Sequence, residues 1–255
     1  MLTPIILFVI LMVLLYIPPV QNLLRREVTA YASKATGMQI QVERIDLRFP
    51  LNLLVRGVEV IQQPDTLLSL ESLNVRVQAW PLLKGKVEVD EVTLSQVAVN
   101  SANLIEGMQI KGVLGRFFLQ SHGVDLSNET AVVNRTELSD THIQLLMTDT
   151  TTTPKDTTAS APVNWKVNLH QLKLKNVSFG MKLPADSMKM AAYIGEATID
   201  DAKADLKNQF YGLKQFLLSG ASASYDTGEA QPSEGFDASH MAVRNIRIGL
   251  DSLLY

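Results

Sequence analysis

Cysteine is absent from the 255 residues of this sequence. Its absence excludes a thiol nucleophile, a disulfide framework and a cysteine metal site, and it suits an oxidising compartment. Aromatic residues make up only 6%, so any core must be mainly aliphatic. Charged residues make up 19% and the net charge is −3, with no basic stripe carrying interleaved aromatic residues. We therefore expect no nucleic-acid partner.

The short motifs of common catalytic and nucleotide-binding sites are also missing. The sequence has no G-x-S-x-G, no P-loop and no G-x-G-x-x-G. Its four histidines do not fall at ligand spacing with one another or with a carboxylate, and we expect them on the surface: His122, His142, His170 and His240. The sequence thus predicts a protein that is not an enzyme, with no catalytic residue, no cofactor and no metal.

The sequence begins with a long apolar run. Residues 1–24 carry no charged side chain, and an unbroken apolar stretch from Ile5 to Ile17 ends at Pro18-Pro19. A helix over residues 2–17 would be about 24 Å long, somewhat short of a hydrocarbon core of roughly 30 Å. Residues 20–24 could extend the buried length beyond the prolines.

We interpret residues 1–19 as a transmembrane anchor. Its candidate membrane-facing residues are Ile5, Phe8, Leu11, Leu15 and Tyr16. A signal peptide and a buried core helix are the alternatives. The positive charges Arg25 and Arg26 follow the run, which by the positive-inside rule favours a cytoplasmic C-terminal side. A basic leader upstream of Met1 would reverse that orientation.

Residues 20–37 have helical spacing. The apolar residues fall at steps of one, three and four on one face: Val20, Leu23, Leu24, Val28, Tyr31 and Ala35. Pro19 suits a first helical position and Gly37 a C-terminal cap. The segment is predicted to be either a juxtamembrane amphipathic helix or a helix that caps the open end of a following sheet, and one helix could do both.

From residue 38 the pattern is typical of strands, and one apolar phrase recurs in it. Its clearest copies step by three, two, three and two: Val89, Val92, Leu94, Val97 and Val99, then Leu169, Leu172, Leu174, Val177 and Phe179. A weaker copy is Val133, Thr136, Leu138, Thr141 and Ile143, and shorter pieces are Ala197, Ile199, Ala202 and Ala204, and Phe216, Leu218, Ala221 and Ala223. Steps of two keep one strand face, and a step of three keeps it only if a bulge or bend absorbs the extra residue. The phrase predicts short strands joined by bends with one apolar face.

Two polar segments divide the strand region. Residues 38–147 form its first part, in which Leu104 to Ser121 is interpreted as two or three short strands broken by glycines. Residues 148–163 are polar and of low complexity, and we predict that a short Gly/Ser loop can replace Asp149 to Pro162. Residues 164–255 continue the strands, with a second polar loop at Gly228 to Gly235. Because the last segment is still in strand phase at Tyr255, we expect a longer chain of which this is a part.

The order of short motifs resembles a known family. An apolar run ends in Tyr16-Ile-Pro-Pro, and Ala35-Thr-Gly closes the amphipathic segment. Ile40-Gln-Val-Glu-Arg-Ile-Asp-Leu, Val55-Arg-Gly-Val-Glu-Val and Pro81-Leu-Leu-Lys-Gly-Lys-Val follow. The sequence is similar to the start of the AsmA-like superfamily, and most closely to its TamB branch in Gram-negative bacteria. The similarity covers roughly residues 5–100.

This resemblance implies a mostly β fold in which an elongated, repeat-like, taco-shaped sheet follows the two N-terminal helices. It implies an inner-membrane protein, with one span and its bulk in the periplasm, that conducts phospholipid between the inner and outer membranes. The ten residues of the two clear phrase copies would line its lipid groove. It also implies an outer-membrane β-barrel partner of the TamA/BamA type, and assembly of outer-membrane barrel proteins is the alternative function. The pattern of residues alone favours an ordinary closed β-sandwich, and the resemblance reverses that preference.

Overall fold

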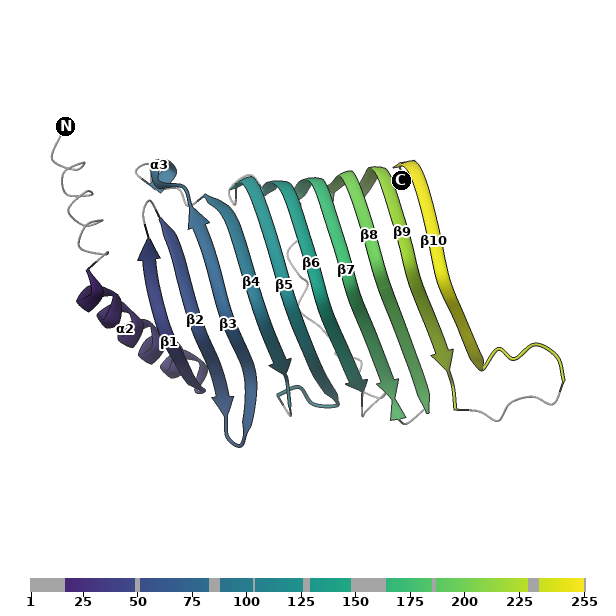
Figure 1. The fold of residues 1–255 in the computed structure, drawn as a ribbon, viewed down its shortest axis with the longest axis horizontal. Helices are drawn as coiled ribbons and strands as arrows, with labels where there is room; N and C mark the ends of the chain where they lie inside the picture. The colour runs from purple at the N-terminus through teal and green to yellow at the C-terminus, as the bar shows by residue number, and fades with distance from the viewer. Residues whose placement is uncertain are drawn as a thin grey trace.

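The computed structural model describes residues 17–48, 51–82, 88–102, 104–125, 129–147, 164–184, 187–228 and 234–254. Its elements, in chain order, are two helices and ten strands: α2 (Pro18–Thr36), β1 (Gln39–Arg48), β2 (Asn52–Gln62), β3 (Asp65–Val77), α3 (Ala79–Leu82), β4 (Val89–Asn100), β5 (Met108–Asp125), β6 (Thr130–Met147), β7 (Lys166–Leu183), β8 (Met188–Asp205), β9 (Phe210–Asp226) and β10 (His240–Leu254) (Figure 1). The prediction of a mostly β fold is confirmed.

All ten strands belong to one sheet, in the order of the sequence from β1 to β10. Every neighbouring pair is antiparallel except β6 and β7, which are parallel. The sheet does not close on itself, because β1 and β10 lie at opposite edges (Figure 1). The alternative of a closed sandwich is therefore wrong for this chain: no second sheet is present in the described ranges to cover the first.

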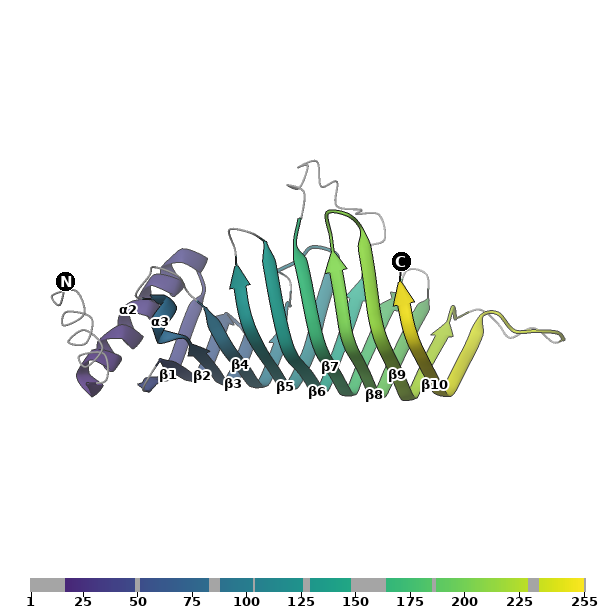
Figure 2. The ribbon, with the colours of Figure 1, turned by 90° about the horizontal axis from the view of Figure 1, so that it is seen from above.

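The strands are long and bent, not short. Seen from above, the sheet is folded into two arms that meet along a ridge (Figure 2). At the steps of three that follow Leu94, Leu138 and Leu174, the residues Gln96, Asp140 and Asn176 have φ of 50°, 52° and 53°. A left-handed residue absorbs the extra position without interrupting the strand. The predicted bends are confirmed, but the prediction of several short strands over Leu104 to Ser121 is wrong, because Met108 to Asp125 form a single strand.

Helix α2 lies against the free edge of β1 (Figure 1). It begins at Pro18, two residues before the predicted start, and Gly37 caps it with φ 69° and an N–H bonded to the Ser33 carbonyl. Gln21 Nε2 donates to the Leu47 carbonyl at 3.1 Å, and Arg25 donates to the Glu43 carbonyl at 2.8 Å. These side chains satisfy backbone groups that an edge strand otherwise leaves to water or to another chain.

The predicted transmembrane run, with its residues Ile5, Phe8, Leu11, Leu15 and Tyr16, lies outside the described residues except at its end, Ile17 to Pro19. From Ile17 onward, none of the described helices combines the length and the apolar character needed to cross a membrane.

The parallel pairing of β6 with β7 constrains the polar segment between them. Thr130 pairs with Lys166 and Leu146 with Lys182, so both strands run from one rim of the bent sheet to the other. The chain must therefore return between the rims to start β7. If four residues replaced residues 148–163, six residues would still connect Met147 to Lys166, and these reach about 24 Å. Two sheets in direct contact are roughly 10 Å apart, so the replacement of this segment by a short loop stays a prediction.

Candidate functional site

The apolar residues of the recurring phrase come together in the sheet. In the parallel pair, Leu172 lies opposite Thr136, Leu174 opposite Leu138, and Val177 opposite Thr141. The clear copy in β7 and the weak copy in β6 are thus in register along their whole length. The clear copy in β4 is aligned in the same way with its own neighbours, since Leu94 lies between Leu73 of β3 and Phe117 of β5.

These pairings build continuous rows that run across all ten strands. One row contains ten residues, one from each strand: Ile45, Val55, Leu73, Leu94, Phe117, Leu138, Leu174, Ala197, Leu218 and Ile248. A second row two positions away contains Leu47, Leu53, Val75, Val92, Leu119, Thr136, Leu172, Ile199, Phe216 and Leu250. We call the side of the sheet that carries these and the parallel rows the apolar face.

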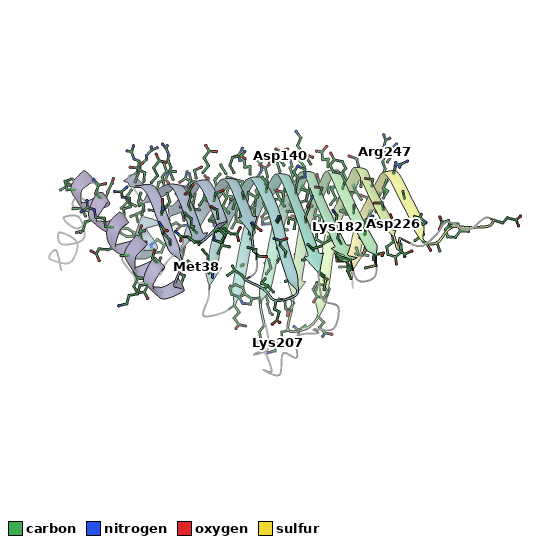
Figure 3. All side chains as sticks on the ribbon, turned by 90° about the horizontal axis from the view of Figure 1, so that it is seen from below. Met38, Asp140, Lys182, Lys207, Asp226 and Arg247 are labelled. Carbon is green, nitrogen blue, oxygen red and sulfur yellow. The ribbon has the colours of Figure 1, made fainter. Side chains whose placement is uncertain are left out.

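The apolar face is the concave side of the bent sheet. Arg247 stands between Ile246 and Ile248 in β10, so it points to the opposite side from both. Figure 3 shows Arg247 and the bend residue Asp140 on the convex side, beyond the ridge where the arms meet. The ten predicted lining residues therefore share the inner side of the bend, and no strand places them on two faces.

Protein covers this face only partly. Within the described residues just four apolar side chains are buried: Leu51, Leu67, Ala197 and Ala221. Of the ten predicted lining residues, eight are half-buried, while Val99 and Phe179 are 39% and 41% exposed. The total accessible surface is 17228 Å², against roughly 11,000 Å² for a compact monomer of this mass. A single bent layer contributes to the excess, because no second layer of the described residues packs against it.

The recurring spacing extends through four strands for which it was not predicted. Strands β1, β2, β3 and β5 carry the same two, three, two spacing in a shorter form, as in Leu53, Val55, Val58 and Val60. Residues 38–77 were predicted only as strands, and Leu104 to Ser121 as short strands broken by glycines, so the step of three was not recognised there. The two, three, two spacing is present in the sequence of these strands, and it can be recognised once each step of three is interpreted as a bend that recurs in every strand.

Glycines permit the bend where neighbouring strands approach closely. A Cβ at Gly57, which has φ 59°, would lie 2.7 Å from the Cβ of Glu43 in β1. A Cβ at Gly115 would lie 2.7 Å from that of Asp140 in β6. Both positions sit on one line of bend residues that crosses the sheet, so a side chain there would push two strands apart.

The convex side carries cross-strand polar contacts. His170 Nδ1 lies 3.1 Å from Asp201 Oδ1, and Lys214 Nζ lies 3.7 Å from Asp201 Oδ2. The hydrogen bond with His170 is the main cause that lowers the pKa of the Asp201 carboxyl, with Lys214 adding to it. Asp201 has φ 48° at a bend. Asp200 beside it accepts a separate hydrogen bond from Gln171 at 3.1 Å, so the two carboxylates do not act as a pair.

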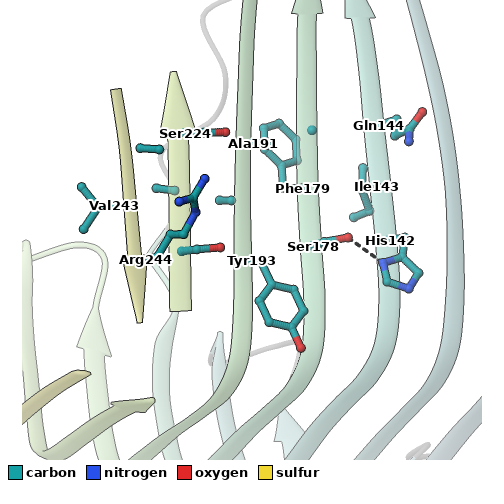
Figure 4. A pocket seen from close by; sticks show the side chains of 15 residues that line it. His142, Ile143, Gln144, Ser178, Phe179, Ala191, Tyr193, Ser224, Val243 and Arg244 are labelled. Atoms are coloured by element: carbon teal, nitrogen blue, oxygen red, sulfur yellow. Dashed lines mark hydrogen bonds between the residues drawn. The ribbon is translucent and has the colours of Figure 1, made fainter. Parts of the chain in front are cut away.

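One hollow on β6–β10 brings polar groups together. Its volume is about 440 Å³, and its lining includes His142, Ser178, Tyr193 and Arg244, which alternate with the apolar rows (Figure 4). His142 Nδ1 and Ser178 Oγ share a hydrogen bond. A nucleophilic serine also needs an acid that orients the imidazole, and none contacts His142 in the described part of the chain. We interpret the pair as a cross-strand contact. The described residues hold no group of side chains suited to a metal ion.

No protein-family model matches this chain, and no curated protein sequence matches it significantly.

Proposed function

We propose that the protein binds the acyl chains of phospholipids along its apolar face and conducts them between two membranes. The observation that carries this proposal is the unpartnered apolar face of a single bent sheet, whose rows continue from β1 to β10 without a charged residue. Covering apolar surface with acyl chains would gain about 25 cal/mol per Å². The resemblance to the AsmA-like superfamily supports a lipid as the ligand.

The geometry suits movement along the sheet better than binding at one point. Ten strands spaced about 4.8 Å apart give a row of about 43 Å, and each strand contributes similar aliphatic side chains to it. Neighbouring positions then bind an acyl chain with similar free energy, so a lipid could pass from strand to strand. The polar convex side stays in contact with water. In this proposal residues 1–19 anchor the chain in the inner membrane and the sheet lies in the periplasm.

The test places a carboxylate on the apolar face. Leu94→Glu and Leu174→Glu can direct the new charge to water if the face is open, so the variants fold but repel acyl chains. Thr93→Glu and Lys173→Glu are the matched controls, since these residues neighbour the leucines on the opposite side of the same strands. Native mass spectrometry of the purified proteins measures bound lipid, and circular dichroism checks the fold. Folded leucine variants that retain as much lipid as the controls contradict the proposal.

A second function is favoured by the bare edge of β10. No strand of the described chain pairs with its outer side, and an open edge can accept an added strand. An assembly factor for outer-membrane β-barrel proteins, acting with a barrel partner, would use this edge. A proline in the middle of β10 would abolish capture of an added strand yet leave lipid bound to β1–β9, which separates the two functions.

A further inference from the structure

The amphipathic helix α2 contacts the sheet mainly through polar and small residues. Its residues nearest β1 are polar or small, and they are half-buried: Gln21, Arg25, Thr29, Ala32 and Ser33. Ser33 Oγ accepts a hydrogen bond from the Ile40 N–H at 3.0 Å, alongside the bonds that Gln21 and Arg25 donate to β1. The helix thus docks by hydrogen bonds to backbone groups, while Leu23, Val28 and Tyr31 stay exposed.

Three large residues of the apolar stripe of α2 are exposed. Leu23 is 57% exposed, Val28 51% and Tyr31 77%. At 100° per residue, Tyr31 lies about 80° from Gln21 and 100° from Ala32, while Val28 borders the contact with β1, about 20° from Gln21. A surface helix in a water-soluble protein ordinarily places its apolar stripe against the core, so this arrangement indicates a partner outside the sheet.

We propose that this stripe of α2 lies in the interface of a phospholipid bilayer. The uncharged apolar run of residues 5–17 leads directly into α2, so a membrane that takes up the run is at once within reach of the stripe. Tyr31 suits the interface, where an aromatic ring sits at headgroup level. Arg25, Arg26 and Lys34 against Glu27 give the helix a positive charge, which favours anionic lipids.

This placement fixes how the sheet meets the membrane. Because α2 contacts β1 on one side and the bilayer on the other, the β1 edge is the end of the sheet that faces the lipid. The apolar rows then begin next to the headgroups, at Ile45 and Leu47. The inference concerns docking only and holds whether or not the sheet carries lipid.

The absence of cysteine allows a direct test on the full-length chain. Single cysteines replace Val28 and Tyr31 on the stripe, and the exposed residues Asn22 and Arg26 away from it serve as matched controls on the same helix. Each variant carries an environment-sensitive fluorophore and is reconstituted into vesicles of phosphatidylethanolamine and phosphatidylglycerol. Lipids brominated at different acyl positions report the depth of the label, and iodide in the buffer reports its contact with water.

The expected result is a difference between the two sides of the helix. Labels at positions 28 and 31 should lie about 5–10 Å below the headgroups, with iodide quenching reduced, while labels at 22 and 26 should remain open to iodide. Equal iodide quenching at all four positions overturns the proposal. Protection at 28 and 31 from both iodide and bromine also overturns it, since it means that protein covers the stripe, either residues 1–16 or a second copy. Loss of bound lipid from Leu94→Glu, with 28 and 31 still embedded, would separate this inference from the lipid-binding function.

Discussion

The two ends of the sheet carry the same apolar rows but differ in what lies beside them. At β1, helix α2 donates to the Leu47 and Glu43 carbonyls, and the inner residues Val42, Ile45 and Leu47 are half-buried. At β10 the outer edge is bare within the described chain, and Ile248, Leu250 and Leu253 are 40%, 43% and 49% exposed.

This difference separates two properties of a strand that usually occur together, namely which of its faces is apolar and how far that face is buried. The spacing of apolar residues decides which face of a strand is apolar, and it does so equally at both ends. Burial depends on what covers the face and the edge, which at the β1 end includes a helix from outside the repeating pattern. The same row thus contributes unequally to stability along its length.

The largest expected effect concerns residues 148–163, which connect β6 to β7 and thereby join the half of the sheet containing β1 to the half containing β10. Deleting residues 148–163 leaves only Asn164 and Trp165 between Met147 and Lys166, which reach about 11 Å. Strand β7 should then not start at the far rim, so the parallel pair is lost and β7–β10 fail to dock. A Gly/Ser segment of the original length should change the free energy of unfolding by less than about 0.5 kcal/mol. Thermal unfolding followed by circular dichroism measures both variants. A deletion variant with native stability would contradict the parallel return.

Glycines at the two ends should respond in opposite ways. Gly57→Ala, next to β1, adds a Cβ 2.7 Å from Glu43 in a left-handed backbone and should cost about 1–3 kcal/mol. Gly249→Ala in β10 meets nothing closer than Leu217 Cδ2 at 3.6 Å and should be neutral or slightly stabilising. Urea unfolding compares them, and equal costs at both positions would show that the bend does not need a glycine.

Isoleucines of one row provide a matched pair across the sheet. Ile45→Ala, beneath the α2-covered edge, should cost about 2 kcal/mol, the low end for a large-to-small change because the residue is only half-buried. Ile248→Ala in β10 should cost less than about 1 kcal/mol, since its side chain is 40% exposed. Chemical denaturation provides both values. An equally large loss at Ile248 in solution would indicate that something covers β10 there.

The contact of α2 with β1 should contribute modestly. Ser33→Ala removes the acceptor of the Ile40 N–H and should cost about 0.5–1.5 kcal/mol. Ala30→Ser, on the exposed side of the same helix, is the control and should be near neutral. Amide hydrogen exchange at Ile40 provides a local readout, because its protection should fall in Ser33→Ala alone. Unchanged protection would mean that β1 does not depend on the helix.

The smallest expected effect concerns the convex side towards the β10 end. The lowered pKa of Asp201 means that its contact with His170 stabilises the fold above the ordinary carboxyl range and is lost as the pH falls through the folded-state pKa. His170→Ala should raise the pKa of Asp201 and leave that of Asp205, held low mainly by the Asn208 N–H, unchanged. Carbon NMR titration of the carboxyls measures both. A pKa of Asp201 that stays low in the variant would exclude His170 as its cause.

In β4 and β7 the sequence indicated the apolar face, because the information there is local. Leu172, Leu174 and Val177 are separated by steps that only a bent strand can reconcile, and Asn176 absorbs the extra residue as expected. The number of strands was harder to predict. Glycines at 112 and 115 suggested strand breaks, whereas Gly115 provides room for Asp140 of the neighbouring strand, a contact between residues far apart in the chain.

By itself the sequence determined which residues are apolar together, where each strand bends, and that a helix ends at Gly37, because side-chain alternation, bulges and capping are properties of neighbouring residues. Only the tertiary structure decided that the strands form one open sheet instead of two packed ones, that β6 and β7 run parallel, and that α2 offers its polar side to β1. These depend on which backbone edges meet, and hydrogen bonds between distant strands and helices select that arrangement among several that bury similar residues.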